Sequence, residues 1–216
     1  HQLGVHHEER FRRSDHGAWI EYSLRFENLP GKTLESEIPP WIHPRRRIEF
    51  SQWSGWAEVA RWAEGHYGDD VLGPLPASVS DEIERISLLP RPEEQICEAL
   101  RFVAAELRYL SLIEGLHRVQ PRSISDVMDR RSGDCKEMVA LLVTMLRALD
   151  LEAFPALVVS SGGAHLQTVI PGASYFDHVI VAVTHGEGIV WLDPTLGGQL
   201  EPVSYTHLTL PTSYPV

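Results

Sequence analysis

The sequence predicts an α+β fold, because helical and extended patterns are segregated along the chain rather than alternating. A broadly apolar helix is predicted over 135–149, and the segments after it have the composition of antiparallel strands. Short stretches over 17–50 alternate polar and apolar residues, which is typical of a β-rich unit. With 216 residues, of which 43% are hydrophobic and 23% charged, the chain falls in the range of globular proteins with a packed core.

The charge balance and the cysteine content exclude several classes of protein. Thirty acidic residues against nineteen basic ones give a formal net charge of −11, so a phosphate-binding surface is not expected and nucleic acid is excluded as a partner. No apolar run approaches the length that spans a bilayer. Two cysteines, Cys97 and Cys135, are compatible with one disulfide or two free thiols and leave the redox compartment open.

The N-terminal part divides into two predicted regions. Residues 1–50 are interpreted as the C-terminal part of a β-rich domain, and residues 51–92 as a helical connector and loop. Apolar residues at helical spacing begin after Ser54, which is placed to cap a connector helix. The segment 68–92 is rich in Gly and Pro, so we expect a loop with at most a short helix near 79–88.

Residues 93–202 form the predicted core domain. Apolar residues every three to four positions predict a helix over 93–109, with carboxylates suited to its N-terminus. Ser123, with Asp126 three residues on, predicts a shorter capped helix through Arg131 that Gly133 ends. The next helix, 135–149, has too broad an apolar surface for a solvent-facing position and should be the buried central helix.

Three extended segments are predicted after the central helix. They cover 153–160, 178–184 and 189–193, and the short connection 185–188 predicts a hairpin between the last two. The long Gly- and Ser-containing segment 161–176 is expected to be a loop that overhangs a site.

Both ends of the sequence suggest a fragment of a longer chain. The sequence starts at His1 without an initiator Met, so we expect a preceding segment to be missing. Residues 203–216 carry no charge, and their first six residues, VSYTHL, resemble one reading frame of a common sequencing-adapter sequence. We therefore interpret 203–216 as a non-native tail; the alternative is a genuine edge strand followed by a Pro-containing terminus.

Cys135 is the first candidate for chemistry. It lies in the first turn of the central helix, where unsatisfied N–H groups and the helix dipole favour a thiolate. The alternative is a small buried residue at a helix start. Position alone does not decide between the two, because a nucleophilic cysteine also needs an imidazole and a group that orients it.

His178 and Asp193 are the candidates for that imidazole and that orienting group. If Thr184 lies opposite Ile189, the hairpin places Asp193 diagonally across from His178 on the same face, with Cβ atoms roughly 7 Å apart. A register slip by one residue would move Asp193 to the opposite face. Taken singly, the two residues have simpler explanations: a His bonded to backbone, and an Asp before Pro194 that opens a turn.

Five segments together resemble the transglutaminase-like superfamily. They are Arg108-Tyr109, Gln120-Pro121, Arg131-Ser132-Gly133-Asp134-Cys135-Lys136-Glu137, Phe176-Asp177-His178-Val179 and Trp191-Leu192-Asp193-Pro194-Thr195. More narrowly, they resemble bacterial proteins in which this core follows an uncharacterised β-rich domain, and the resemblance extends over about 50–198. It implies a papain-like core, with a central Cys-bearing helix packed on an antiparallel sheet. It also implies a catalytic triad with Cys135 as nucleophile, His178 as base and acid, and Asp193 as its orienting group.

Two details of this resemblance remain open. Glu137 stands where the family would have Asp, which keeps the charge. The backbone N–H of Cys135 is the expected oxyanion donor, and Gln120 is a tentative second donor if the intervening segment folds back. The alternative for Gln120 is a structural amide beside Pro121.

The other candidate residues carry less weight. His117 and His165 are candidates for the cleft, with solvated loop histidines as the alternative, and Cys97 is expected to be a packed thiol. The cluster at 6–9 (His-His-Glu-Glu) is interpreted as a mobile terminal segment rather than a metal site, because no predicted strand or helix fixes its geometry. No metal and no cofactor are predicted.

The function expected from these residues is that of a thiol enzyme acting on amide bonds of a peptide, a protein or a cell-wall-like substrate. Hydrolysis is favoured over transamidation, because transfer to an amine requires a site that excludes water and nothing in the sequence reveals one. The other alternative is a non-catalytic binding module with the same core. Family resemblance suggests a periplasmic or cell-envelope location, although the sequence contains no signal segment; the oligomeric state is not predicted.

Overall fold

The computed structural model describes residues 4–14, 17–27, 48–111, 120–160, 166–167 and 169–197. The chain divides into two compact units, 1–47 and 48–216, and its architecture is mixed α/β. The expected tail 203–216 lies outside the described residues, as do the possible strands over 28–47. The finer division of the second unit into a connector and a core domain stays a prediction.

The first unit contains an antiparallel hairpin. Strand β1 (Gly4–Ser14) pairs with β2 (Gly17–Glu27), with Gly4 opposite Glu27 and Ser14 opposite Gly17. Strands were expected here, but residues 6–9 were interpreted as a mobile segment, and that interpretation is wrong. They belong to β1, because 22–25 of β2 supply backbone partners along their whole length.

The second unit begins with four helices: α1 (Trp56–Glu64), α2 (Asp69–Leu72), α3 (Ala77–Ser87) and α4 (Pro92–Glu106). The Pro- and Gly-containing segment is thus more helical than expected, because α3 buries Val79 and Ile86 on the face that packs against α4. Gly55, rather than Ser54, is the N-cap of α1. The backbone N–H of Ser54 instead donates to the Glu58 carboxylate at 2.7 Å.

The central part of the unit contains α5 (Ile124–Arg130) and α6 (Cys135–Ala148), with two short strands that form a parallel pair. The Ser123 side chain accepts the Asp126 N–H as predicted, at 3.2 Å. The helix was expected to run through Arg131 and to be stopped by Gly133; it ends one residue earlier, at Arg130, and its C-cap is Arg131, which adopts a left-handed conformation with φ 52°. Gly133 belongs instead to β4 (Ser132–Gly133), which pairs with β3 (Arg108–Tyr109).

The last part of the unit is a three-stranded antiparallel sheet in the order β5–β6–β7. Its strands are β5 (Ala153–Val158), β6 (His178–His185) and β7 (Gly188–Leu192), and a 3-10 turn at Ala173–Tyr175 precedes β6. Thr184 lies opposite Ile189, so the predicted hairpin register is confirmed.

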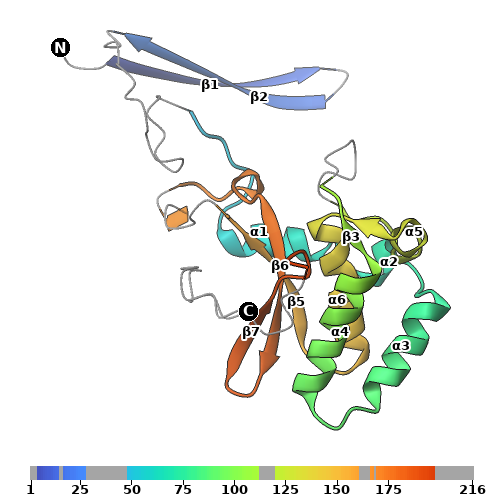
Figure 1. The fold of residues 1–216 in the computed structure, drawn as a ribbon. Helices are drawn as coiled ribbons and strands as arrows, with labels where there is room; N and C mark the ends of the chain where they lie inside the picture. Colours follow the sequence, from blue (N-terminus) through green and yellow to red (C-terminus); the bar gives the residue numbers. More distant parts are fainter. Residues whose placement is uncertain are drawn as a thin grey trace, which may run out of the picture. The chain divides into compact units, whose positions relative to one another are not determined.

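Helix α6 is the centre of the second unit. It packs on β5 and β6, α4 packs against α6, and α3 packs against α4, away from the sheet (Figure 1). Its most deeply buried side chains have no exposed surface: Val139, Leu141, Leu142, Val143, Met145 and Leu146. This packing explains why α6 lacks a polar stripe, and it directs the helix N-terminus towards the start of β6.

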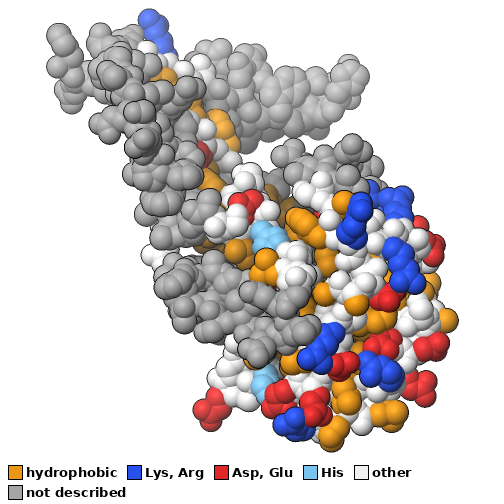
Figure 2. All heavy atoms as spheres, in the orientation of Figure 1, with side chains coloured by type: hydrophobic (Ala, Val, Ile, Leu, Met, Phe, Trp, Pro, Cys, Tyr) orange, Lys and Arg blue, Asp and Glu red, His pale blue; other side chains and the backbone are white. Residues whose placement is uncertain are grey.

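The surface of the helical part is a mixture of charges. On the face shown in Figure 2, basic and acidic side chains are interspersed rather than gathered by sign. Exposed ion pairs of this kind include Arg85 with Glu82 and Glu98, at 2.7 and 3.0 Å. Among the described residues, no helix has the length and apolar character needed to cross a membrane.

Candidate active site

Cys135 is the first residue of α6, and the start of this helix has a reciprocal capping box formed by Asp134 and Glu137. The Asp134 side chain accepts the Glu137 N–H at 3.4 Å, and the Glu137 carboxylate accepts the Asp134 N–H at 3.1 Å. This capping box sets the residue at which the helix begins. No described residue accepts the backbone N–H of Cys135, so this group remains an available donor beside the sulfur.

Two ion pairs lie around the cap and are largely buried. Lys136 contacts Asp134, and Arg122 Nη1 lies 2.6 Å from Glu137 Oε1, with the Glu137 side chain only 2% exposed. Burial raises the pKa of Asp134 above its ordinary value, although the bond from Lys136 opposes that effect. Each carboxylate of the capping box therefore has a cationic partner. Such a partner is needed because a buried charge without one would destabilise the fold.

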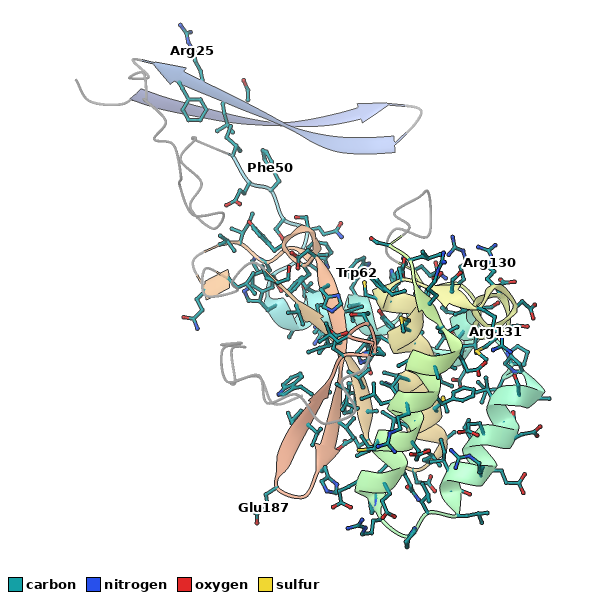
Figure 3. The ribbon with its side chains drawn as sticks, in the orientation of Figure 1. Arg25, Phe50, Trp62, Arg130, Arg131 and Glu187 are labelled. Carbon is teal, nitrogen blue, oxygen red and sulfur yellow. The ribbon has the colours of Figure 1, made fainter. Side chains whose placement is uncertain are left out.

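His178 and Asp193 lie at the open end of the β6–β7 hairpin, opposite the tip that carries Glu187 in Figure 3. His178 is the first residue of β6 and Asp193 directly follows β7. His178 Nε2 lies 2.8 Å from Asp193 Oδ2. The structure thus brings the two residues together across the hairpin, as the predicted register requires.

The second oxygen of Asp193 is bonded to the residue that follows Pro194. Thr195 donates its backbone N–H to Asp193 Oδ1 at 3.0 Å and its hydroxyl at 2.6 Å. Asp193 therefore opens a turn, as the simpler explanation predicts, and also contacts the imidazole. These bonds hold the 6% exposed carboxylate in one orientation.

The Cys135 side chain interacts with the His178 ring, so the three predicted residues lie in one group. The hydrogen bond with Asp193, and next the interaction with Cys135, raise the pKa of His178 to about 10 despite partial burial. Burial by itself would raise the pKa of Asp193, but the bonds from His178 and Thr195 outweigh it and lower this pKa. The geometry thus favours an imidazolium paired with a carboxylate at neutral pH.

The segment before His178 is held by two neighbouring elements. Trp56 of α1 makes edge contacts with Tyr175 and Phe176, at centroid distances of 6.1 and 5.9 Å. The Asp177 carboxylate accepts both the backbone N–H and the hydroxyl of Ser160, each at 2.7 Å. These contacts determine where the chain enters β6 and therefore where the imidazole lies.

The remaining predicted candidates do not join this group. Gln120 is exposed, and its amide makes no hydrogen bond within the described part of the chain. His117 and His165 lie outside the described residues. Cys97 is half-buried on α4, and both cysteines are free, so the disulfide alternative is wrong. No set of three or more His, Cys, Asp or Glu side chains suited to a metal ion occurs among the described residues.

Two tyrosines near Cys135 were given no role by the sequence. Tyr109, on β3, is 42% exposed; burial raises its pKa, and Cys135, Asp134 and Asp193 add to the effect. Tyr67, between α1 and α2, is 4% exposed, and burial followed by Cys135 and Asp134 raises its pKa. Tyr109 lies in a segment already singled out by its resemblance, whereas no local pattern marks Tyr67.

Comparisons with known proteins give a structural similarity only. The fold matches a crystal structure of a "putative protease" from Parabacteroides distasonis with a TM-score of 0.58, at 15% identity over 88% of this chain. The chain spans 37% of the length of that protein. A "putative cysteine protease" from Cytophaga hutchinsonii matches with a TM-score of 0.34, at 14% identity over 91% of this chain and 65% of that one. No protein-family model matches the sequence, and no curated protein matches it.

Proposed function

We propose that the second unit is a thiol enzyme of the transglutaminase-like superfamily that hydrolyses amide bonds, as a peptidase or amidase. The observation that carries the proposal is the 2.8 Å contact between His178 Nε2 and Asp193 Oδ2, beside a cysteine at a helix N-terminus. The fold similarity to the Parabacteroides distasonis protein supports a protease-like fold. The proposed roles are Cys135 as nucleophile, His178 as acid and base, and Asp193 as the group that orients the imidazole.

The proposed reaction begins with transfer of the thiol proton. Because Asp193 engages Nε2, Nδ1 is the ring nitrogen left to face Cys135, and its uptake of the thiol proton forms the imidazolium and the thiolate from which the reaction proceeds. The thiolate attacks the amide carbon and forms a C–S bond, while the carbonyl π electrons move to oxygen. The tetrahedral intermediate collapses, the C–N bond breaks, and the imidazolium gives its proton to the leaving nitrogen.

Water completes the cycle. His178 takes a proton from water, the resulting hydroxide attacks the thioester carbon, and the C–S bond breaks to release the carboxylic acid and return the sulfur. The Cys135 N–H is the proposed backbone donor to the oxyanion, and Gln120 stays a tentative second donor. The substrate class is proposed as a peptide, protein or cell-wall-like amide.

Selective alkylation tests the proposal without knowledge of the substrate. In a Cys97→Ser background, iodoacetamide at pH 6 should label Cys135 much faster than it labels a free thiol, because the helix N-terminus and the imidazolium provide positive charge beside the reacting sulfur. Cys135→Ala should remove the labelling, as peptide mapping by mass spectrometry would show. If Cys135 reacts no faster than a free peptide thiol, the proposal fails and the non-catalytic module is favoured.

Hydrolysis and transamidation are separated by their products. A mixture of peptide amides incubated with the enzyme should yield carboxylic acids, and an added primary amine should not be incorporated. Mass spectrometry with and without the amine distinguishes the two outcomes. Products that contain the amine would make transamidation the activity.

A further inference from the structure

The side chain of Tyr67 is a buried polar group near the sulfur that the mechanism above does not use. It lies in the turn between α1 and α2, where its backbone N–H donates to the Glu64 carbonyl at 2.9 Å. The side chain is 4% exposed and belongs to the main hydrophobic core. Within the described residues, however, no group is hydrogen-bonded to its hydroxyl.

This hydroxyl is not sealed inside the core. Every fully inaccessible side-chain nitrogen or oxygen atom of the described residues has a hydrogen-bond partner. An unpartnered hydroxyl must therefore retain some accessible surface. A hydroxyl that remains accessible while its ring is packed among apolar side chains is suited to donate a hydrogen bond to a polar atom of a ligand.

The neighbours of the phenol identify where that atom would be. Cys135, the first residue of α6, packs against the same hydrophobic core that holds Tyr67, and Cys135 and the N-cap Asp134 both act on the phenol electrostatically. Burial of the ring, and next these two neighbours, raise the pKa of Tyr67, so the hydroxyl keeps its proton and remains a donor. The Cys135 N–H points out of the same helix end without an acceptor among the described residues.

We propose that the Tyr67 hydroxyl donates a hydrogen bond to the oxyanion that forms when Cys135 attacks a carbonyl carbon. The inference rests on the proposed function and adds a catalytic residue to it. In this step the C–S bond forms and the carbonyl π electrons move to oxygen. The hydroxyl then shares the new negative charge with the Cys135 N–H, and its hydrogen bond is released when the C=O bond reforms and the leaving group departs.

Tyr67 suits this role better than Gln120, the donor suggested by the sequence. The Gln120 amide is exposed, so water competes for its N–H groups and its orientation is not set by packing. The Tyr67 ring is held by the core, which fixes its hydroxyl before the charge appears. A donor that is already oriented and shielded from water stabilises an oxyanion more strongly than a mobile one.

A comparison of two reactions of Cys135 tests the proposal. Alkylation by iodoacetamide forms no oxyanion, whereas acylation by p-nitrophenyl acetate passes through one, and neither requires the natural substrate. Both rates are measured in the Cys97→Ser background with and without Tyr67→Phe, which removes one oxygen atom. Tyr67→Phe should slow acylation between about 10- and 100-fold and leave the alkylation rate within about twofold.

Tyr109→Phe removes the same atom from the exposed phenol and is the comparison variant. The proposal is overturned if Tyr67→Phe leaves acylation unchanged, if it slows both reactions equally, or if the selective loss follows Tyr109→Phe instead. Thermal unfolding of Tyr67→Phe is measured in parallel, so that a loss of folded protein is not counted as a loss of rate. If Cys135 of the parent protein is alkylated no faster than a free thiol, the proposed function itself has failed.

Discussion

The bond between His178 and Asp193 predicts a stability difference that depends on pH. Asp193→Asn keeps the size and shape of the side chain and removes its negative charge. His178 then has no anionic partner at Nε2, which lies 2.8 Å from the carboxylate in the parent protein. We expect the pKa of His178 to fall from about 10 towards its ordinary value of 6.5.

The magnitude follows from the two pKa values. A difference of about 3.5 pH units would correspond to roughly 5 kcal/mol of folding free energy at about 1.4 kcal/mol per unit. The His178 side chain is 20% exposed, so solvent screening lowers this upper bound, and we expect about 2 kcal/mol. A raised histidine pKa stabilises the fold fully below pH 6.5, and this contribution is lost as the pH rises through about 10.

Urea unfolding at pH 6 and pH 9, followed by tryptophan fluorescence, measures this dependence. Asp193→Asn should destabilise the protein at pH 6. At pH 9, only about a third of this difference in unfolding free energy between the parent protein and the variant should remain. Glu187→Gln, at the tip of the same hairpin, removes an exposed charge and is the matched control. A loss of equal size at both pH values, or an unchanged His178 pKa in an NMR titration of the variant, would refute the reasoning.

Three further substitutions test the surroundings of the site. Arg122→Ala leaves the buried Glu137 carboxylate without its cation and should lower the free energy of unfolding, measured by urea titration, by about 3 kcal/mol. Arg85→Ala removes one partner of an exposed ion pair and should have a much smaller effect. Gly133→Ala adds a Cβ 3.0 Å from the Glu137 Cβ, so it should lower the free energy of unfolding by about 1–3 kcal/mol and slow the alkylation of Cys135. Unchanged labelling and stability would show that the capping box accommodates the added methyl group. Leu142→Ala removes a fully buried side chain of α6 and should cost about 2–5 kcal/mol by the same titration, so a loss below 1 kcal/mol would contradict its central position.

Where the determinants are local, the structure follows the sequence closely. The broad apolar surface predicts a helix over 135–149, and α6 covers Cys135–Ala148. The short connection between β6 and β7 leaves few registers, and the one with Thr184 opposite Ile189 is observed. This register brings His178 and Asp193 together, because the pairing of two strands fixes which of their side chains lie on the same face of the sheet.

Contacts between segments distant in sequence account for the features that no local pattern predicts. The segment 68–92 contains enough Pro and Gly to favour a loop with at most a short helix near 79–88; α3 is that helix, and it spans Ala77–Ser87 because its apolar face is buried against α4. Residues 6–9 show no clear strand pattern, and pairing with β2 makes them part of β1. The parallel contact of β3 with β4, where Leu110 N–H donates to the Gly133 carbonyl at 2.9 Å, likewise joins segments more than twenty residues apart.

The sequence by itself predicted a mixed α/β architecture, the central helix and the hairpin register that brings His178 and Asp193 together, since helix periodicity and hairpin register are set by neighbours along the chain. Only the tertiary structure decided which groups surround the sulfur. Tyr67 lies near Cys135, while Gln120 is exposed and unbonded within the described residues. The physical reason is that an amphipathic helix or strand leaves a periodic pattern of apolar residues in the sequence. The packing of one helix against another brings distant residues together without leaving such a pattern.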